Sequence, residues 1–299
     1  MDQKTTTFST VHTVLWRADG RTVVIGADMP VVVIGEKINP TGKKAFADEL
    51  RRGDLSRVRT WAREQTEAGA GVIEVNVGTD GINEAELLPA AVEAAMESTD
   101  LPLSIDTANP KAMEAALTVY KGKALLNSTT GESHRLEAIL PVAVAHKAAI
   151  VGLCYDEKGI SAEPHTRLQV AEKIVNKAAA AGLSIEDVVL DPLAFPVSTD
   201  HCAALVTLET ARLIRAHIGT NLTLGVSNTS FGLPDRPALN VTMLVLAIAA
   251  GVTCPIVDPT RPEIMRAVKA CDLLTGRDEM AMRWIQHFRA TGSKQRDTG

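Results

Sequence analysis

The stretch VIEVNVGTDGINEAELLPAAVEAAMESTDLPLSIDTANP, from Val72 to Pro110, carries the pattern on which the fold depends. It begins with a short apolar run at 72–78, continues with apolar residues at helical spacing over 84–97, and returns to an apolar run at 101–107. A second helix is expected to open at Asn109–Pro110, because proline suits the first position of a helix. The apolar runs hardly alternate with polar residues, which is typical of parallel strands buried on both faces.

The same alternation of strand and helix runs along most of the chain. The strands are predicted at 31–39, 72–78, 101–107, 123–129, 148–155, 187–193, 222–228 and 252–259. The helices that follow them are predicted at 54–68, 84–97, from 109, from about 134, and at 164–181, 200–217, 237–250 and 261–274. Eight such units in 299 residues predict an α/β fold of the (β/α)8 TIM barrel type. A doubly wound open sheet is the rival, but VIGEKINPTGKK after the first strand lacks the phosphate-loop pattern G-x-G-x-x-G.

Two segments flank the predicted barrel. Residues 11–26 contain two β-prone runs around Asp19-Gly20, which is a hairpin turn signal. We expect one domain over 1–299, in which 1–30 form an N-terminal β-hairpin extension, 31–274 form the barrel, and 275–299 form a C-terminal helix and tail.

Composition excludes several classes of protein. The net charge is -5, and Lys and Arg are spread along the chain, so no basic face for nucleic acid is indicated. The longest apolar runs, such as MLVLAIAAGV at 243–252, are too short to span a bilayer, and the N-terminus lacks a signal-peptide pattern. A cytoplasmic protein without a membrane partner is expected. The four cysteines are far apart and are interpreted as free thiols.

Polar residues stand at the ends of the predicted strands. In a barrel, the side chains at the C-terminal ends of the strands converge on one mouth. In chain order these residues are Glu36 with Asn39 just beyond it, Asn76, Asp106, Asn127, Tyr155 with Asp156, Asp191, Asn228 and Asp258. Asp and Asn dominate the set, and no Lys, Arg or His stands at a strand end. Such residues often cap helices or stabilise loops, and Asn109 and Asp200 are interpreted as caps.

Asp106, Asn127 and Asp191 differ from the others because each directly follows a dense apolar run. A carboxylate in such a place is costly to bury unless donors satisfy it. Carboxylates accept hydrogen bonds from N–H groups, and an amide both accepts and donates. The pattern therefore favours a neutral, planar ligand that is rich in N–H donors. A phosphate ligand would be repelled, because it needs basic groups or free helix N-termini.

The motifs GEKINPTG, SIDT, LLNST, VVLDPL and GVSN…DR, in this order, resemble the pterin-binding barrel superfamily, to which dihydropteroate synthase also belongs. More closely, they resemble the methyltetrahydrofolate:corrinoid protein methyltransferases, over about residues 31–260. The resemblance implies that Asn228 is the catalytic residue, near the pterin N5 atom that carries the methyl group. It assigns Arg236 to the partner protein or to the folate tail. The residues that it assigns to pterin binding are Asp106, Asn127, Asp191, Asn228 and, more loosely, Asn39 and Asn76.

The resemblance also implies an activity. A methyl group would move between N5 of tetrahydrofolate (as 5-methyltetrahydrofolate) and the cobalt of a corrinoid, with Asn228 stabilising charge at N5. The cobalt-ligating motif D-x-H-x-x-G is absent, so cobalamin is expected on a corrinoid-binding partner protein. The family is typically homodimeric, and a homodimer is expected here. No bound metal is expected, because the cysteines and histidines are not grouped as zinc ligands: His201 and Cys202 are adjacent but open a helix.

Two alternatives remain open. Dihydropteroate synthase uses a Lys in a Ser-x-Lys segment of the seventh strand and an Arg-x-His at the eighth. The segments found here are SNTS and PIVDP, so both basic features are missing. The second alternative is a non-catalytic subunit that only docks a corrinoid protein. A scaffold of that kind has no need for buried carboxylates.

Overall fold

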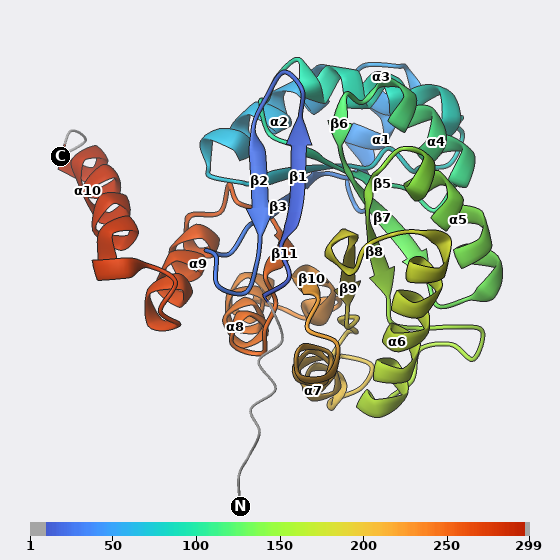
Figure 1. The fold of residues 1–299 in the computed structure, drawn as a ribbon. Helices are drawn as coiled ribbons and strands as arrows, with labels where there is room; N and C mark the ends of the chain where they lie inside the picture. The colour runs from blue at the N-terminus through green and yellow to red at the C-terminus, as the bar shows by residue number, and fades with distance from the viewer. Residues whose placement is uncertain (1–9, 297–299) are drawn as a thin grey trace, which may run out of the picture.

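The computed structural model describes residues 10–296; the predicted extension and tail positions 1–9 and 297–299 lie outside the described residues. Eight parallel strands close into a barrel in the order β10-β11-β3-β4-β5-β7-β8-β9 (Figure 1). Their bounds are β3 (Ile34–Ile38), β4 (Val72–Val75), β5 (Leu103–Asp106), β7 (Leu125–Thr130), β8 (Ala149–Leu153), β9 (Val188–Asp191), β10 (Asn221–Gly225) and β11 (Cys254–Val257). The closed barrel confirms the predicted (β/α)8 fold over the open sheet.

Helices surround the barrel, and most of them match the predicted segments. They are α1 (Lys44–Arg51), α2 (Ser56–Glu67), α3 (Glu84–Met96), α4 (Pro110–Val119), α5 (Ser133–Ala145), α6 (Pro164–Ala181), α7 (Ala203–His217), α8 (Arg236–Ala249), α9 (Pro262–Leu274) and α10 (Met282–Arg296). Pro110 begins α4 as expected, and the side chain of Asn109 accepts from the backbone N–H of Lys111 at 3.0 Å. Helix α1 was not predicted. Asp200 accepts from the backbone N–H of Cys202 at 2.8 Å, so it holds the turn before α7, which begins three residues later than expected.

Several strands end earlier than predicted. The second strand ends at Val75 and the seventh at Gly225, each three residues before the predicted end at 78 or 228. The residues that follow form turns instead of pairing with a neighbouring strand. Asn76 accepts from the backbone N–H of Gly78 at 2.7 Å, and 226–230 form a short 3-10 helix, η2 (Val226–Ser230). The polar residues of the mouth therefore lie partly on strand tips and partly on the turns beyond them.

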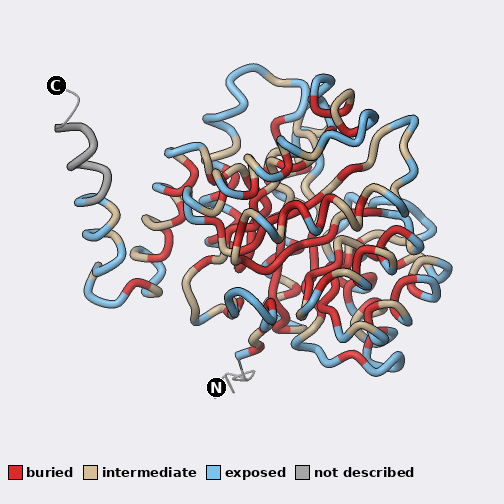
Figure 2. The backbone as a smooth tube through the Cα atoms, turned by 90° about the horizontal axis from the view of Figure 1, so that it is seen from above, coloured by how far each residue is buried: buried red, intermediate tan, exposed pale blue. Residues whose placement is uncertain are grey.

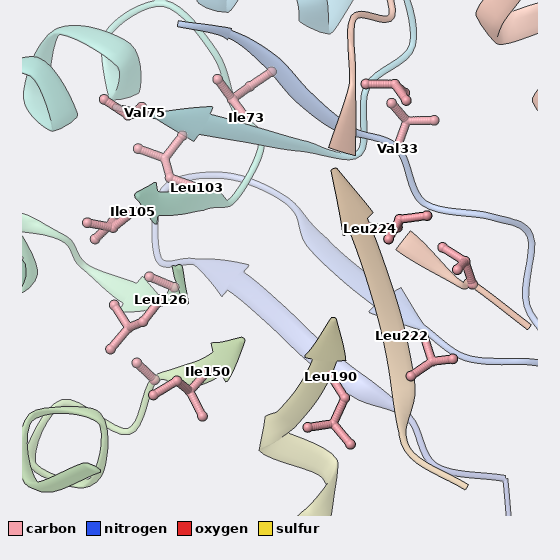
Figure 3. Packing of buried hydrophobic residues seen from close by; sticks show 14 of the residues in the cluster. Val33, Ile73, Val75, Leu103, Ile105, Leu126, Ile150, Leu190, Leu222 and Leu224 are labelled. Carbon is pink, nitrogen blue, oxygen red and sulfur yellow. The ribbon is translucent and has the colours of Figure 1, made fainter. Parts of the chain in front are cut away.

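Two apolar layers hold the barrel together. The side chains on the outer face of the strands belong to one buried cluster with apolar side chains of the helices. Figure 3 shows Ile73, Leu103 and Leu190 among the strand side chains of this cluster. Inside the barrel, Ile34, Val72 and Leu125 form a separate buried cluster at the N-terminal ends of their strands. The burial of the strands in Figure 2 follows this arrangement, with the exposed residues at the periphery. Burial on both faces explains why the strands read as continuous apolar runs.

The predicted N-terminal hairpin covers the end of the barrel where the strands begin. Strands β1 (Thr13–Arg17) and β2 (Thr22–Ile25) are antiparallel, and β1 also pairs with β6 (Gly122–Lys123) (Figure 1). The fully buried side chains of Leu15 and Ile25 belong to the inner cluster of the barrel. Asn221, at the start of β10, donates to the backbone oxygen of Ile25 at 2.9 Å and to the side chain of Thr13 at 3.0 Å. The hairpin is thus part of the barrel core and closes the end opposite the mouth.

Replacing Leu15 with alanine is expected to lower the free energy of unfolding by about 2–5 kcal/mol, because it leaves a cavity in the inner cluster. Val14 is the matched control: its side chain is 36% exposed on the other face of the same strand, and Val14→Ala should cost far less. Urea unfolding followed by circular dichroism measures both. Equal losses for the two variants would show that the hairpin contributes little to the barrel core.

Among residues 10–296, no helix combines the length and the apolar character that a membrane crossing requires. Helix α10 extends away from the barrel beyond α9 (Figure 1).

Candidate functional site

Polar side chains from neighbouring strands meet at the mouth of the barrel. Asp106 is the last residue of β5, and it is paired in register with Asn127 of β7. Asp191 is the last residue of β9, in register with Leu153 of β8. The structure therefore places these three sequence-predicted residues on strands at one end of the barrel, as their positions in the sequence indicate.

Four residues on β4, β5 and β7 and on the turn directly after β4 form a hydrogen-bonded group, which we call the β4–β7 cluster: Glu74, Asn76, Asp106 and Asn127. Asn76 donates through Nδ2 to Asp106 Oδ2 at 2.8 Å. Asn127 donates through Nδ2 to Glu74 Oε1 at 2.8 Å, and Ser104 donates to the same oxygen at 3.3 Å. The two amides are thus oriented by carboxyl groups. Asp106 and Asn127 are both half-buried, so their remaining polar atoms can serve a ligand.

The carboxyl groups of Glu74 and Asp106 are buried, and burial disfavours their charged forms. Burial raises the pKa of Asp106 to about 6, against the hydrogen bond from Asn76. Burial, followed by the charge of Asp106, raises the pKa of Glu74 well above its ordinary value. Glu74 is only 3% exposed. Burial and the neighbouring carboxyl group of Asp106 thus favour the neutral form of Glu74.

Asp191 lies on the other side of the mouth and is 7% exposed. Its Oδ1 accepts from the backbone N–H of Leu193 at 2.7 Å. Burial raises the pKa of Asp191 to about 6, while backbone hydrogen bonds from Leu193 and Gly225 and the charge of Arg167 oppose the rise. The buried Arg167 donates to the carbonyl oxygens of Pro192 and Leu193 at 2.8 and 2.9 Å. It thereby fixes the turn that carries the donor to Asp191.

Asn228 does not stand on a strand tip, as the sequence suggested, but on η2, one turn beyond the end of β10. Its side chain is exposed, and its amide lies over Gly225, where a Cβ would come within 3.0 Å of Nδ2. The backbone of Gly225 also hydrogen-bonds to Asp191, so this glycine lies beside both side chains. Arg236 donates to Ser227 O at 2.9 Å and to Ser230 Oγ at 3.0 Å, so it braces the turn. Arg236 is exposed.

A second group of charged residues lies beside this turn, around Glu36 of β3. The hydroxyl of Ser227 donates to Glu36 Oε2 at 3.3 Å. Asp258 raises the pKa of Glu36 electrostatically, after the larger effect of burial, and Lys43 opposes the rise. Sequence reasoning placed no basic residue at the strand ends, but Lys37 is the penultimate residue of β3, and its ammonium pairs with Glu64 of α2 at 2.7 Å. Lys43 reaches the mouth from the loop after β3. Its ammonium donates to the carbonyl oxygens of Lys37 and Asn39, each at 3.0 Å.

Not every predicted residue joins the other site groups. The side chain of Asn39 accepts from the backbone N–H of Thr41 at 2.9 Å and so stabilises its own turn. Asn76, the other loosely matched residue, belongs to the β4–β7 cluster instead. Sequence reasoning missed Glu74 as a site residue. Its signal was available, since a lone carboxyl two residues before Asn76 in an apolar strand must face the same side.

In the described part of the chain, one group of side chains has the spacing of metal ligands: Asp200, His201 and Cys202, whose ligand atoms lie within 4.8 Å of one another. They occupy the turn before α7, and the side chain of His201 is 95% exposed. The two carboxylates of the mouth, Asp106 and Asp191, are not part of this group.

Comparisons with known proteins agree with this geometry. The pterin binding enzyme family matches residues 35–258. A methylcorrinoid:tetrahydrofolate methyltransferase of Eubacterium limosum is 30% identical over 267 residues, which cover 87% of this chain and 96% of that protein. A methionine synthase of Mycobacterium tuberculosis is 30% identical over 273 residues, but these cover only 23% of that longer protein.

Among solved structures, a dihydropteroate synthase of Yersinia pestis is similar, with a TM-score of 0.67 and 18% identity over 90% of this chain and 100% of that one. A dihydropteroate synthase of Vibrio fischeri has a TM-score of 0.67 and 17% identity, and covers 89% of this chain. At this identity the likeness concerns the barrel fold alone. The family match spans the barrel from β3 to the end of β11, including every strand tip described above, and the chain therefore belongs to the pterin binding enzyme family.

Proposed function

We propose that the protein is an enzyme that moves a methyl group between N5 of tetrahydrofolate and the cobalt of a corrinoid protein. The observation that carries the proposal is the set of buried acceptors at the mouth of a pterin binding enzyme barrel, in a chain whose relative from Eubacterium limosum is a methylcorrinoid:tetrahydrofolate methyltransferase. Asp106 and Asp191 contribute carboxylate oxygens from two sides of the mouth. A pterin ring offers amino and ring N–H donors that suit such acceptors.

In this proposal, the β4–β7 cluster and Asp191 hold the pterin ring. Asp106 and Asp191 accept from its N–H groups, and Asn127 presents an amide whose orientation is fixed by Glu74. Asn76 supports Asp106, and Asn39 shapes the loop after β3. The donors of the ligand replace the water that a buried carboxylate lacks, so binding relieves the cost of keeping these groups charged.

Asn228 acts at N5, the reacting atom. The methyl group leaves a tertiary amine poorly unless N5 gains positive character, and the acceptor must be a strong nucleophile, such as a Co(I) corrinoid. The exposed amide on η2 binds the protonated N5 through its oxygen and so stabilises the charge that develops there. The enzyme itself does little covalent work and contributes mainly position and charge stabilisation.

The corrinoid arrives on a partner protein, which docks at the mouth. The opposite end is filled by the β1–β2 hairpin, so the mouth is the end from which cobalt can approach N5. Arg236 and the loops at 128–135 and 156–166 are the surfaces proposed for the partner or for the glutamate tail of folate. We further propose that residues 1–299 act as one domain, that the protein is a cytoplasmic homodimer as the resemblance to its family suggests, and that it needs no resident metal.

The segments beyond β10 and β11 disfavour dihydropteroate synthesis. Neither Ser227–Ser230 nor 255–259 contains a basic residue. Arg236, the basic side chain beside η2, donates to Ser227 and Ser230 of that turn. These two segments therefore offer no basic group of their own to a departing diphosphate.

Methylcobalamin mixed with tetrahydrofolate and the enzyme should lose its characteristic absorption band as 5-methyltetrahydrofolate forms. Omitting tetrahydrofolate is the control, and the band should then persist. Binding of 5-methyltetrahydrofolate is measured separately, by the fluorescence of Trp61, which lies under Lys43 near the mouth with the ammonium 5.5 Å from the ring centroid. A protein that docks a corrinoid protein but neither binds the pterin nor transfers methyl would instead be a non-catalytic subunit.

A further inference from the structure

The proposed reaction needs a proton at N5, and Asn228 cannot supply one, because an amide does not ionise at neutral pH. A hydrogen bond links one carboxyl group to the turn that carries Asn228. Glu36 Oε2 accepts from the hydroxyl of Ser227 at 3.3 Å, and Ser227 directly precedes Asn228 on η2. A carboxyl group is therefore linked to the turn that carries the residue proposed to contact N5.

Glu36 has no ion-pair partner in the part of the chain that the structure describes. The two cations near it are engaged with other groups. Lys43 donates to the carbonyl oxygens of Lys37 and Asn39, and Arg236 donates to Ser227 O and Ser230 Oγ. Glu36 is left with a hydroxyl as its partner, and this arrangement allows the carboxyl to gain and lose a proton without breaking an ion pair.

Burial and the charged groups around Glu36 together bring the pKa of its carboxyl close to neutral pH. Burial raises its pKa to about 7, and Asp258 from the loop after β11 adds to the rise. Lys43, Ser227 and Arg236 oppose it, in that order. Glu74 of β4 also interacts electrostatically with Glu36, and its own pKa is raised, mainly by burial. A carboxyl group with a pKa near 7 is suited to both donating and accepting a proton.

We propose that Glu36 is the proton store of the active site: it gives a proton to N5 when the methyl group leaves the folate, and it takes the N5 proton when the methyl group is added. The proposal rests on the proposed methyl transfer and adds to it a source for the proton. Ser227 belongs to the same turn as Asn228, and its hydroxyl holds the carboxyl of Glu36 against that turn.

The proposed methyl transfer conserves atoms and electrons. The protonated carboxyl of Glu36 gives its proton to N5 of 5-methyltetrahydrofolate. The Co(I) centre of the corrinoid attacks the methyl carbon with an electron pair and becomes methyl-Co(III). The electrons of the broken C–N bond stay on N5, which keeps the proton as N5–H of tetrahydrofolate. Glu36 is left as a carboxylate and takes up a proton from solvent. In the reverse direction, the carboxylate takes the N5–H proton and releases it to solvent.

The two directions therefore have opposite pH dependences. Demethylation of 5-methyltetrahydrofolate needs the acid form of Glu36, so kcat should fall as pH rises through about 7. Methylation of tetrahydrofolate needs the carboxylate, so kcat should rise over the same range. Protonation of Asp106 and Asp191, whose pKa values lie at about 6, acts on pterin binding and appears as a higher KM at lower pH in both directions.

The test is Glu36→Gln, which keeps the shape and a hydrogen-bonding group but cannot titrate. We expect kcat with cob(I)alamin and 5-methyltetrahydrofolate to fall about 100-fold, with little change in pterin affinity, and the limb near pH 7 to disappear. Asp258→Asn removes a negative neighbour and should shift that limb to lower pH. Glu209→Gln is the matched control, since Glu209 is exposed on α7 and pairs with Arg212; its kinetics should match the wild type.

The outcomes separate the two proposals. Wild-type kcat and an unaltered pH limb in Glu36→Gln, in a preparation whose wild-type protein transfers methyl, would remove Glu36 from the mechanism and leave the methyltransferase intact. An equal fall of kcat at every pH in Glu36→Gln, with no shift of the limb in Asp258→Asn, would assign Glu36 a structural role and contradict the proposal. A wild-type protein that neither binds 5-methyltetrahydrofolate nor transfers methyl would overturn both proposals together.

Discussion

Asn228→Ala is expected to lower kcat/KM for methyl transfer by about 100- to 1000-fold, mostly through kcat. The amide lies on η2 at the mouth, and our proposal gives it the one contact that strengthens as N5 becomes charged. Its loss should therefore raise the free energy of the methyl-transfer transition state more than it weakens binding of the substrate in the ground state. Single-turnover kinetics with cob(I)alamin and 5-methyltetrahydrofolate measure kcat, and fluorescence titration measures pterin affinity. Asn176→Ala, at an exposed position of α6, is the control.

A second substitution at the same position identifies the atom that acts. Asn228→Asp keeps an acceptor oxygen but removes the amide N–H. If the oxygen stabilises protonated N5, the aspartate variant should retain far more activity than the alanine variant. Equal losses in both variants would show instead that the amide N–H is the working group, bound to neutral N5. Unchanged kinetics in Asn228→Ala would remove this residue from the reaction.

The double variant Asp106→Ala with Asp191→Ala is expected to weaken binding of 5-methyltetrahydrofolate by about 100- to 10,000-fold. Each carboxylate is proposed to accept a charge-assisted hydrogen bond worth about 1.5–3 kcal/mol, or roughly 10- to 150-fold. The two lie on different strands, β5 and β9, and no hydrogen bond joins them in the described chain, so their effects should nearly multiply. Isothermal titration calorimetry gives the affinity. Asp48→Ala, on the exposed face of α1, is the control.

In the double variant, the melting temperature of the unliganded protein should not fall together with the affinity for 5-methyltetrahydrofolate. Burial raises the folded-state pKa of Asp106 and of Asp191 from 3.8 to about 6. A raised pKa means that their contribution is most favourable at low pH and is lost as pH rises through about 6. At pH 7.5 the wild type bears this cost and the double variant does not, although Asp191→Ala also removes the acceptor of Leu193 N–H. A collapse of the melting temperature in the double variant would show that the carboxylates serve the fold instead of the ligand.

The sequence was sufficient for the architecture because each strand is buried on both faces and reads as an apolar run. Asp106, Asn127 and Asp191 were placed correctly at the mouth, since each lies at or near the end of such a run. Helix α1 was missed because it is only eight residues long, too short for a clear period. Its buried side chains are Phe46, Ala47 and Leu50.

Other parts of the site depend on side chains that reach across the fold. Lys43 follows the first strand by five residues, and nothing in its local sequence shows that its ammonium turns back to the mouth. Glu74 was overlooked because it lies within an apolar strand, although its parity with Asn76 places it inside the barrel. The role of Arg236 in bracing η2 also depends on three-dimensional contacts with Ser227 and Ser230.

The β1–β2 hairpin closes the barrel at the N-terminal ends of its strands, opposite the mouth. Leu15 and Ile25 occupy the space through which a second route would pass. In the proposed function, folate and cobalt share the mouth as their entrance, so the pterin would enter before the corrinoid protein covers it. Product folate is likewise retained until that protein leaves. A compulsory order of addition and release follows from a feature at the end of the barrel farthest from the chemistry.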